Sequence, residues 1–263
     1  MADAELRRAK REGGDEAVAE VMKRRMRAGE LEPWKVKLLS WLHCRPAMLI
    51  YEPGSGGSLL GEIWRLIGAE GISLEKPWPT TVFCAGLLTA FEDLIPQPSG
   101  EPRVQELVEI TADLRRYCAG QASEGELVSV LPTVAGHAAH FESHTIAQRY
   151  ARAVMHALVA AQASNFPASS AQARECLGML SDACYYAWEY YTGDPDDYSE
   201  FAPFVELLDS TCKAHNPVDY VAVGTSVDEG GPGYYFDMDV ISECASIMLS
   251  RIARGFVHDW LLR

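Results

Sequence analysis

The sequence predicts an all-α protein, and three observations support this fold class. About eight segments of the chain carry apolar side chains at helical spacing. Residues 220–223 form the one stretch with the pattern of a short strand. Glycine and proline mark the ends of several periodic segments, as they do in helical proteins. We therefore expect a multi-helix array or bundle that includes a small N-terminal helical unit.

The N-terminal helical unit is predicted for residues 1–51. Asp15 can cap a first helix that ends at Gly29. The apolar face of this helix consists of Val18, Val21, Met22 and Met26. Pro33 suits the first turn of a second helix, whose apolar residues are Trp34, Leu38, Trp41 and Leu42. The stretch RRMRAGELEPWKVKLLSWL resembles a short helical leader that precedes many bacterial proteins of unrelated function.

A linker at residues 52–58 (EPGSGGS) separates this unit from the main helical domain, residues 59–263. Its glycines do not indicate a P-loop, because the Gly-Lys-Ser/Thr of that motif is absent. The first long helix beyond the linker covers residues 79–94 and is apolar almost all round. Such a helix is expected in the middle of the core.

Two helices are expected between residues 104 and 130. The first is amphipathic and stops at Gly120, and its apolar face consists of Val104, Leu107, Val108, Thr111, Leu114 and Cys118. The second is shorter, from Glu124 to Val130. It is expected to end before Pro132, because proline has no amide hydrogen to continue the helical pattern.

Two later helices carry matching apolar stripes, which predict an antiparallel helical hairpin. The stripe of the first helix consists of Ile146, Tyr150, Ala153, Val154, Ala157 and Ala161. The stripe of the second helix repeats the same spacings with Cys176, Leu180, Ala183, Cys184, Ala187 and Tyr191. Small residues on both stripes would let the two helices approach closely.

The rest of the chain is expected to add two helices separated by an irregular segment. One helix covers residues 199–214, and the last begins at about Asp239. The segment between them, residues 217–236, breaks the helical pattern. Within it, Tyr220 to Val223 could form a short strand, and Gly230 to Gly233 form a loop.

Charge and cysteine content narrow the function classes. The formal net charge is −14, with +3 on residues 1–45 and −17 on the remainder. Such an acidic body disfavours nucleic acid and anionic membranes and favours a basic partner. The 7 cysteines are scattered without a C-x-x-C motif, so we expect buried, reduced thiols and neither a disulfide framework nor a zinc site. The sequence has no apolar run of membrane-spanning length and no apolar N-terminal signal, which predicts a cytoplasmic location.

Three of the seven histidines lie close together, at positions 137, 140 and 144. Spacings of three and four would place His137, His140 and His144 on one helical face, where imidazoles can share a metal ion. However, Phe141 occupies the position at which an HExxH motif requires its glutamate. A hydrogen-bonded histidine cluster is therefore the main interpretation. A metal site, with a helical metal-binding protein or metalloenzyme as the function, is the alternative.

An aromatic run followed by carboxylates is the second candidate site. Residues 185–191 contain five aromatic rings, and only some of them can face the hairpin core. The others are expected at the surface, where aromatic rings are favoured interface anchors. Acidic residues follow directly, and the loop at 228–233 again combines acids with nearby tyrosines. The predicted partner-binding residues are Tyr186, Trp188, Tyr190, Asp194, Asp196, Asp197, Asp228 and Glu229.

The segment from about residue 100 to 215 resembles the Ala-rich, helical immunity proteins of bacterial toxin systems. The resemblance rests on the stretches HAAHFESHTIAQRYARAVMHALVAAQAS and ARECLGMLSDACYYAWEYYTGD. It implies a protein that binds and neutralises a basic toxin, with no catalytic residues and no cofactor. Neither Gly-x-Ser-x-Gly nor the context of a nucleophilic cysteine occurs. A scaffold component of a bacterial assembly is a further alternative.

Overall fold

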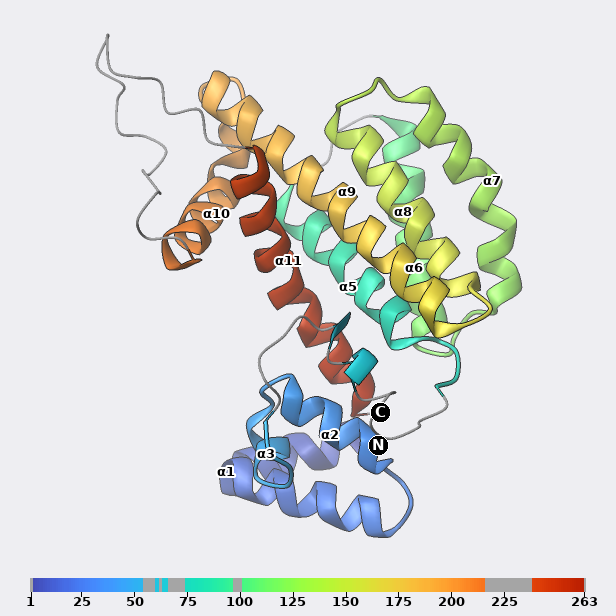
Figure 1. Ribbon diagram of the computed structural model, residues 1–263, viewed down its shortest axis with the longest axis vertical. Coiled ribbons are helices and arrows are strands. Elements are labelled where there is room, and N and C mark those ends of the chain that lie inside the picture. The colour runs from blue at the N-terminus through green and yellow to red at the C-terminus, as the bar shows by residue number, and fades with distance from the viewer. Residues whose placement is uncertain are drawn as a thin grey trace.

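The structure is a computed structural model that describes residues 2–53, 60–61, 63–65, 74–96, 101–215 and 238–262. Within these ranges the chain is helical and contains no strand, which confirms the predicted all-α, multi-helix array (Figure 1). The strand expected at residues 220–223 and the loop expected at 230–233 lie outside the described residues.

Three helices at the bottom of Figure 1 make up the N-terminal unit. These are α1 (Ala2–Arg27), α2 (Pro33–Trp41) and α3 (Arg45–Met48). Helix α1 begins well before the predicted start at Asp15, but Gly14, with φ of 69°, divides it into two helical parts at that point. Both parts bury apolar residues, among them Leu6, Val18 and Met22.

Helix α5 (Pro79–Leu94) lies in the middle of the remaining helices, as its sequence predicted. It contacts α6 (Pro102–Cys118), α8 (Ile146–Gln162), α9 (Phe166–Gly193) and α11 (Met238–Leu261). Helix α5 is buried on nearly every side because these four helices surround it. The approach of α11 is close, since a Cβ atom added at Gly86 would lie only 3.0 Å from the Cβ atom of Phe256.

Helices α8 and α9 form the predicted hairpin, and their contact is the most extensive between any two described helices. The turn between them is short, because Asn165 already caps α9 by accepting a hydrogen bond from the Ala168 amide at 2.9 Å. Eleven of the twelve stripe residues are buried; Tyr191, the last of them, is partly exposed. The small residues on both stripes thus allow α8 and α9 to pack closely, which fixes the position of α9 against α8.

The prediction of a short helix ending before Pro132 is wrong. Helix α7 (Glu124–His140) continues through that proline. Ser123 and Glu126 form a reciprocal capping box at its start. Beyond the proline, Val134 and Ala138 are buried and α7 packs along α8. This burial offsets the cost of a proline inside a helix, about 3 kcal/mol.

The chain then adds the short 3-10 helix η1 (Ser199–Phe201) and α10 (Ala202–His215), which contacts α11. In Figure 1, α11 runs from α10 down to the N-terminal unit. There the Nε2 atom of His258 lies 3.0 Å from the Sγ atom of Cys44. The buried apolar side chains of the N-terminal unit and of the later helices form one continuous cluster. The division at residues 52–58 stays a prediction.

All seven cysteines are free thiols, and only Cys118 is not fully buried, in agreement with the prediction. Among the described helices, none combines the length and apolar character that crossing a membrane requires.

Candidate functional site

The end of α9 presents a concentrated group of carboxylates. Residues 193–200 are all exposed, and four of them are acidic: Asp194, Asp196, Asp197 and Glu200. No ion pair joins these four carboxylates to any residue that the structure describes. Asp194 ends the helix, and its side chain accepts a hydrogen bond from the Asp197 amide at 3.3 Å, which holds the turn.

Stacked aromatic rings lie beside these carboxylates. The rings of Tyr190 and Tyr198 stack with centroids 5.5 Å apart, and Tyr198 also stacks on Phe201 at 6.1 Å. Phe201 is buried, whereas 36% of Tyr198 is exposed. We call the surface formed by these exposed groups the acidic tip, and it consists of Tyr190, Asp194, Asp196, Asp197, Tyr198 and Glu200.

Two of the predicted surface anchors are not at the surface. Tyr186 and Trp188 are buried, with 7% and 9% of their areas exposed. The prediction missed this because it assumed one buried face on α9, against α8. In the structure α9 also contacts α5, α10 and α11, so a second face is covered. Asp228 and Glu229, the other predicted members of this site, lie outside the described residues.

The three clustered histidines do not share one helical face, so that prediction is wrong. Helix α7 ends at His140, Phe141 is extended, and His144 lies in the following turn with φ of 65°. His137 contacts Glu106 of α6 at 2.7 Å, and the Nδ1 atom of His144 lies 2.9 Å from the Tyr186 hydroxyl. In the described part of the chain, no three His, Cys, Asp or Glu side chains converge in a way that could hold a metal ion.

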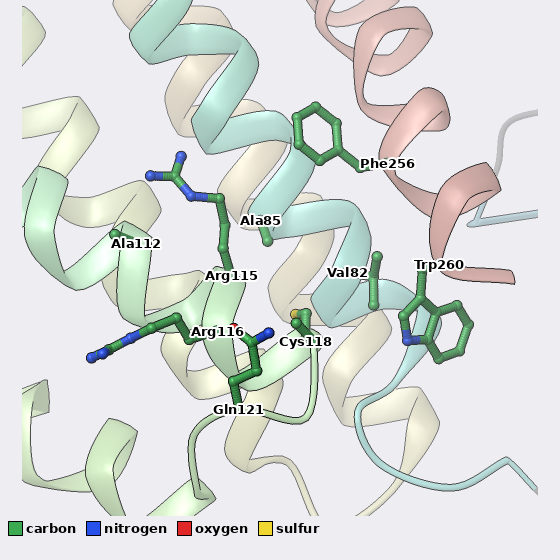
Figure 2. Close-up of a pocket in the computed structure, with 10 residues that line it drawn as sticks. Val82, Ala85, Ala112, Arg115, Arg116, Cys118, Gln121, Phe256 and Trp260 are labelled. Carbon is green, nitrogen blue, oxygen red and sulfur yellow. The ribbon is translucent and has the colours of Figure 1, made fainter. Parts of the chain in front are cut away.

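A cleft opens where α5, α6, the turn after α6 and α11 meet. Its volume is about 540 Å³. In Figure 2, Arg115 and Phe256 stand on either side of Ala85, and Trp260 lies beside Val82. The described lining residues include two arginines and no acidic side chain: Val82, Ala85, Ala112, Arg115, Arg116, Cys118, Ala119, Gln121, Phe256 and Trp260.

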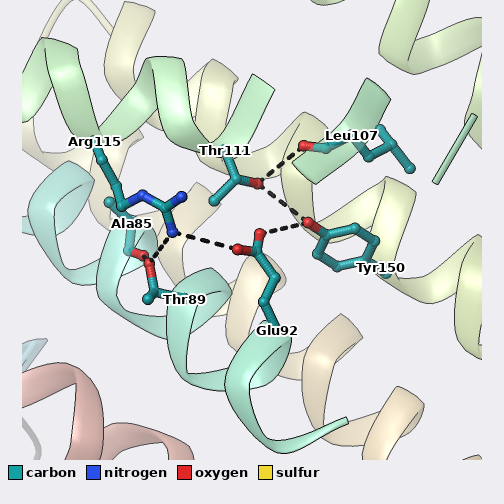
Figure 3. A network of polar contacts seen from close by, with 7 residues as sticks. All are labelled: Ala85, Thr89, Glu92, Leu107, Thr111, Arg115 and Tyr150. Atoms are coloured by element: carbon teal, nitrogen blue, oxygen red, sulfur yellow. Dashed lines mark hydrogen bonds and ion pairs between the residues drawn. The ribbon is translucent and has the colours of Figure 1, made fainter. Parts of the chain in front are cut away.

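A partly buried polar network holds one of these arginines (Figure 3). The Nη1 atom of Arg115 donates to the Thr89 hydroxyl at 2.9 Å and contacts Glu92 at 3.3 Å. The hydroxyl of Tyr150 donates to the other carboxylate oxygen of Glu92 at 2.5 Å. Burial raises the pKa of Glu92 above its ordinary value, although Tyr150 and Arg115 oppose the increase. Burial and the nearby Glu92 raise the pKa of Tyr150 as well.

Sequence reasoning missed Tyr198 and every residue of the cleft. Tyr198 follows the acidic turn directly and could have been grouped with the aromatic run before it. For the cleft, the available signal was the spacing of Phe256 and Trp260, four residues apart on one helical stripe. Nothing in the sequence indicates that Arg115 lies near them.

Comparison with protein-family models, with curated protein sequences and with solved structures gives no match. A function for this chain therefore has to be inferred from its own geometry and charge.

Proposed function

We propose that this chain is a protein-binding protein of the immunity type, which recognises a basic protein partner through the acidic tip. The observation that carries this proposal is the row of four exposed carboxylates without described ion-pair partners, next to partly exposed, stacked tyrosines. Carboxylates that already neutralise a neighbouring cation would have little to offer a partner. These carboxylates keep their charge available.

The charge of the whole chain supports a basic partner. The formal net charge is −14, so the long-range electrostatic field of the chain attracts cations and concentrates them near acidic surfaces. Charges at the edge of an interface mainly increase the association rate and orient the encounter. The tip carboxylates would therefore speed binding, and the effect would weaken as salt screens it.

The stacked rings would contribute to the lifetime of the complex. Tyr198 is held between Tyr190 and Phe201, so it loses little side-chain freedom on binding. Rigid, partly exposed tyrosines are effective anchors for this reason. Tyr186 and Trp188 are buried, so they are not among the residues proposed to contact the partner.

We further propose that binding takes place in the cytoplasm. Seven free thiols without a disulfide suit a reducing compartment.

The test is copurification with the product of the neighbouring gene, followed by binding kinetics on two matched variants. The first variant carries Asp194→Asn, Asp196→Asn and Asp197→Asn. The control removes three exposed carboxylates elsewhere, with Asp93→Asn, Glu109→Gln and Glu175→Gln. Both variants change the net charge equally, so a difference between them reports the position of the charges.

We expect the tip variant to associate more slowly and with a flatter salt dependence, and the control to bind nearly as the parent does. An equal loss of association rate in both variants would show that only the net charge of the chain matters. Unchanged binding in both variants would exclude the acidic tip as the binding site. Self-association of the purified chain without any partner would favour the scaffold alternative.

A further inference from the structure

The cleft between α5, α6 and α11 has the size of a small-molecule site. Its volume of about 540 Å³ falls within the usual range for such sites, roughly 300–1,000 Å³. Its walls are mainly apolar, and its charged lining residues are both arginines. Although the chain has 37 acidic residues, none is among the described lining residues. The two arginines are therefore the charged side chains at the cleft, each paired with a carboxylate outside its lining, Glu92 and Asp113, and the cleft lies outside the acidic tip.

Arg115 is held in place before any ligand binds. Its contacts with Thr89 and Glu92 use one terminal nitrogen, Nη1. No contact with a described residue uses Nε or Nη2, and about a third of the side chain (35%) is exposed. A guanidinium presents five N–H donors in a planar fork, so its unused edge can take a second carboxylate with two parallel hydrogen bonds.

Arg116 differs from Arg115 in both position and pairing. Its side chain is 59% exposed and contacts Asp113 of the same helix at 2.6 Å. Figure 2 shows it extending away from Phe256 and Trp260. Arg116 therefore lies at the rim of the cleft with its charge paired to Asp113, and Arg115, which keeps one edge of its guanidinium without a described contact, is the anchoring group.

Two aromatic rings of α11 are part of the apolar lining of the cleft. Phe256 and Trp260 are four residues apart and so share one helical face. The close approach of α11 to Gly86 holds Phe256, and Lys35 of the N-terminal unit lies 5.7 Å from the centre of the Trp260 ring. Both rings are thus positioned by contacts that do not depend on a ligand.

We propose that this cleft binds a small organic anion with a flat apolar body, of the aromatic carboxylate class. The carboxylate pairs with the free edge of the Arg115 guanidinium, where geometry favours a two-point contact. The apolar body lies against Phe256 and Trp260, since aromatic rings attract one another in stacked or edge-on arrangements. Binding of this ligand is independent of the protein partner proposed for the acidic tip.

The test uses 2-naphthoate as the probe and 2-naphthamide as its neutral counterpart, with affinities measured by isothermal titration calorimetry on the full chain. We expect saturable binding of naphthoate and binding of the amide at least about tenfold weaker, because a charged hydrogen-bonded contact is lost. Absence of naphthoate binding, or equal affinities for the two compounds, would overturn the proposal.

Variants locate the site. Arg115→Gln is expected to weaken naphthoate binding by about 10- to 100-fold. Arg103→Gln, at the other end of α6 and 41% exposed, serves as the control and should bind as the parent does. A second variant, Ala112→Phe, narrows the cleft from α6 and leaves Arg115 and its network intact, so it should also reduce binding. Urea denaturation of each variant verifies folding. If a folded Ala112→Phe chain and a folded Arg115→Gln chain bind like the parent, the cleft is not the site.

Discussion

The interior of the helical array and the acidic tip contain the same two kinds of side chain, aromatic rings and carboxylates, in opposite environments. Inside, Trp188 and Tyr150 are covered, and Glu92 has two partners. At the tip, Tyr198 is partly exposed, and the carboxylates have no described ion-pair partner. Residue type alone therefore does not separate a stabilising group from a recognition group. What distinguishes the two kinds of group is the number of helices that pack around each position.

The largest expected effect is on Trp188. Trp188→Ala should lower the free energy of unfolding by about 3–5 kcal/mol, because it removes a large buried ring and leaves a cavity. Tyr198→Ala at the tip is the comparison, and we expect a much smaller loss of stability. Urea denaturation of both variants measures the difference. A Trp188→Ala chain as stable as the parent would mean that the ring is not part of the core.

The next effect concerns the hydroxyl of Tyr150. Tyr150→Phe keeps the ring stacked on Phe91, at a centroid distance of 5.5 Å, but removes the donor to Glu92. A buried carboxylate that loses a hydrogen-bond donor costs about 1–3 kcal/mol of stability. Chemical denaturation at neutral pH should show this loss. If stability does not change, Glu92 must have found another donor, and the network does not have the described form.

A third effect depends on pH. The pKa of Glu92 is raised above its ordinary value of 4.5 by burial. At pH values between the ordinary pKa of the unfolded chain and the raised pKa of the folded chain, the folded state binds more protons than the unfolded state. The free energy of unfolding therefore falls as pH rises through this interval. Glu92→Gln removes this contribution and should flatten the decline. Denaturation of the parent and the variant at a series of pH values from 4.5 upward measures the slopes. The exposed Glu109→Gln change is the control, and a parent-like slope in Glu92→Gln would contradict the burial argument.

The smallest effect on stability is expected at the tip itself. Replacing Asp194, Asp196 and Asp197 with asparagine should change the free energy of unfolding by less than about 0.5 kcal/mol, as exposed substitutions usually do. The same variant should bind a basic partner more slowly. A large loss of stability would mean that these carboxylates serve the fold, and the comparison between interior and tip would fail.

The parts of the fold that sequence patterns predicted are those determined by neighbours along the chain. The stripes that begin at Ile146 and Cys176 gave the hairpin, because small residues at helical spacing indicate a helix pair in close contact. The apolar character of residues 79–94 on all sides predicted the central helix. Gly29 and Gly120 were expected as helix ends, and both have positive φ values.

The parts that were missed depend on contacts between distant segments. Pro132 remains inside a helix because Val134 and Ala138 pack behind it, and Trp188 is buried because α9 has neighbours on more than one side. The cleft combines Arg115 of α6 with rings of α11, and no pattern within either helix indicates that they meet. A local pattern predicts which face of a helix is apolar, but it does not predict how many faces will be covered.

The position of α11 also has a consequence for the order of events during synthesis. Helix α5 leaves the ribosome long before Met238 is made, whereas α8 and α9 follow each other directly and can pair as soon as both have emerged. The face of α5 at Gly86 must wait for α11. We infer that a nascent chain arrested before Met238 leaves this face accessible, which limited proteolysis of the arrested chain would detect as cleavage within α5. Arrival of α11 would then cover this face of α5, complete the cleft and bring His258 to Cys44.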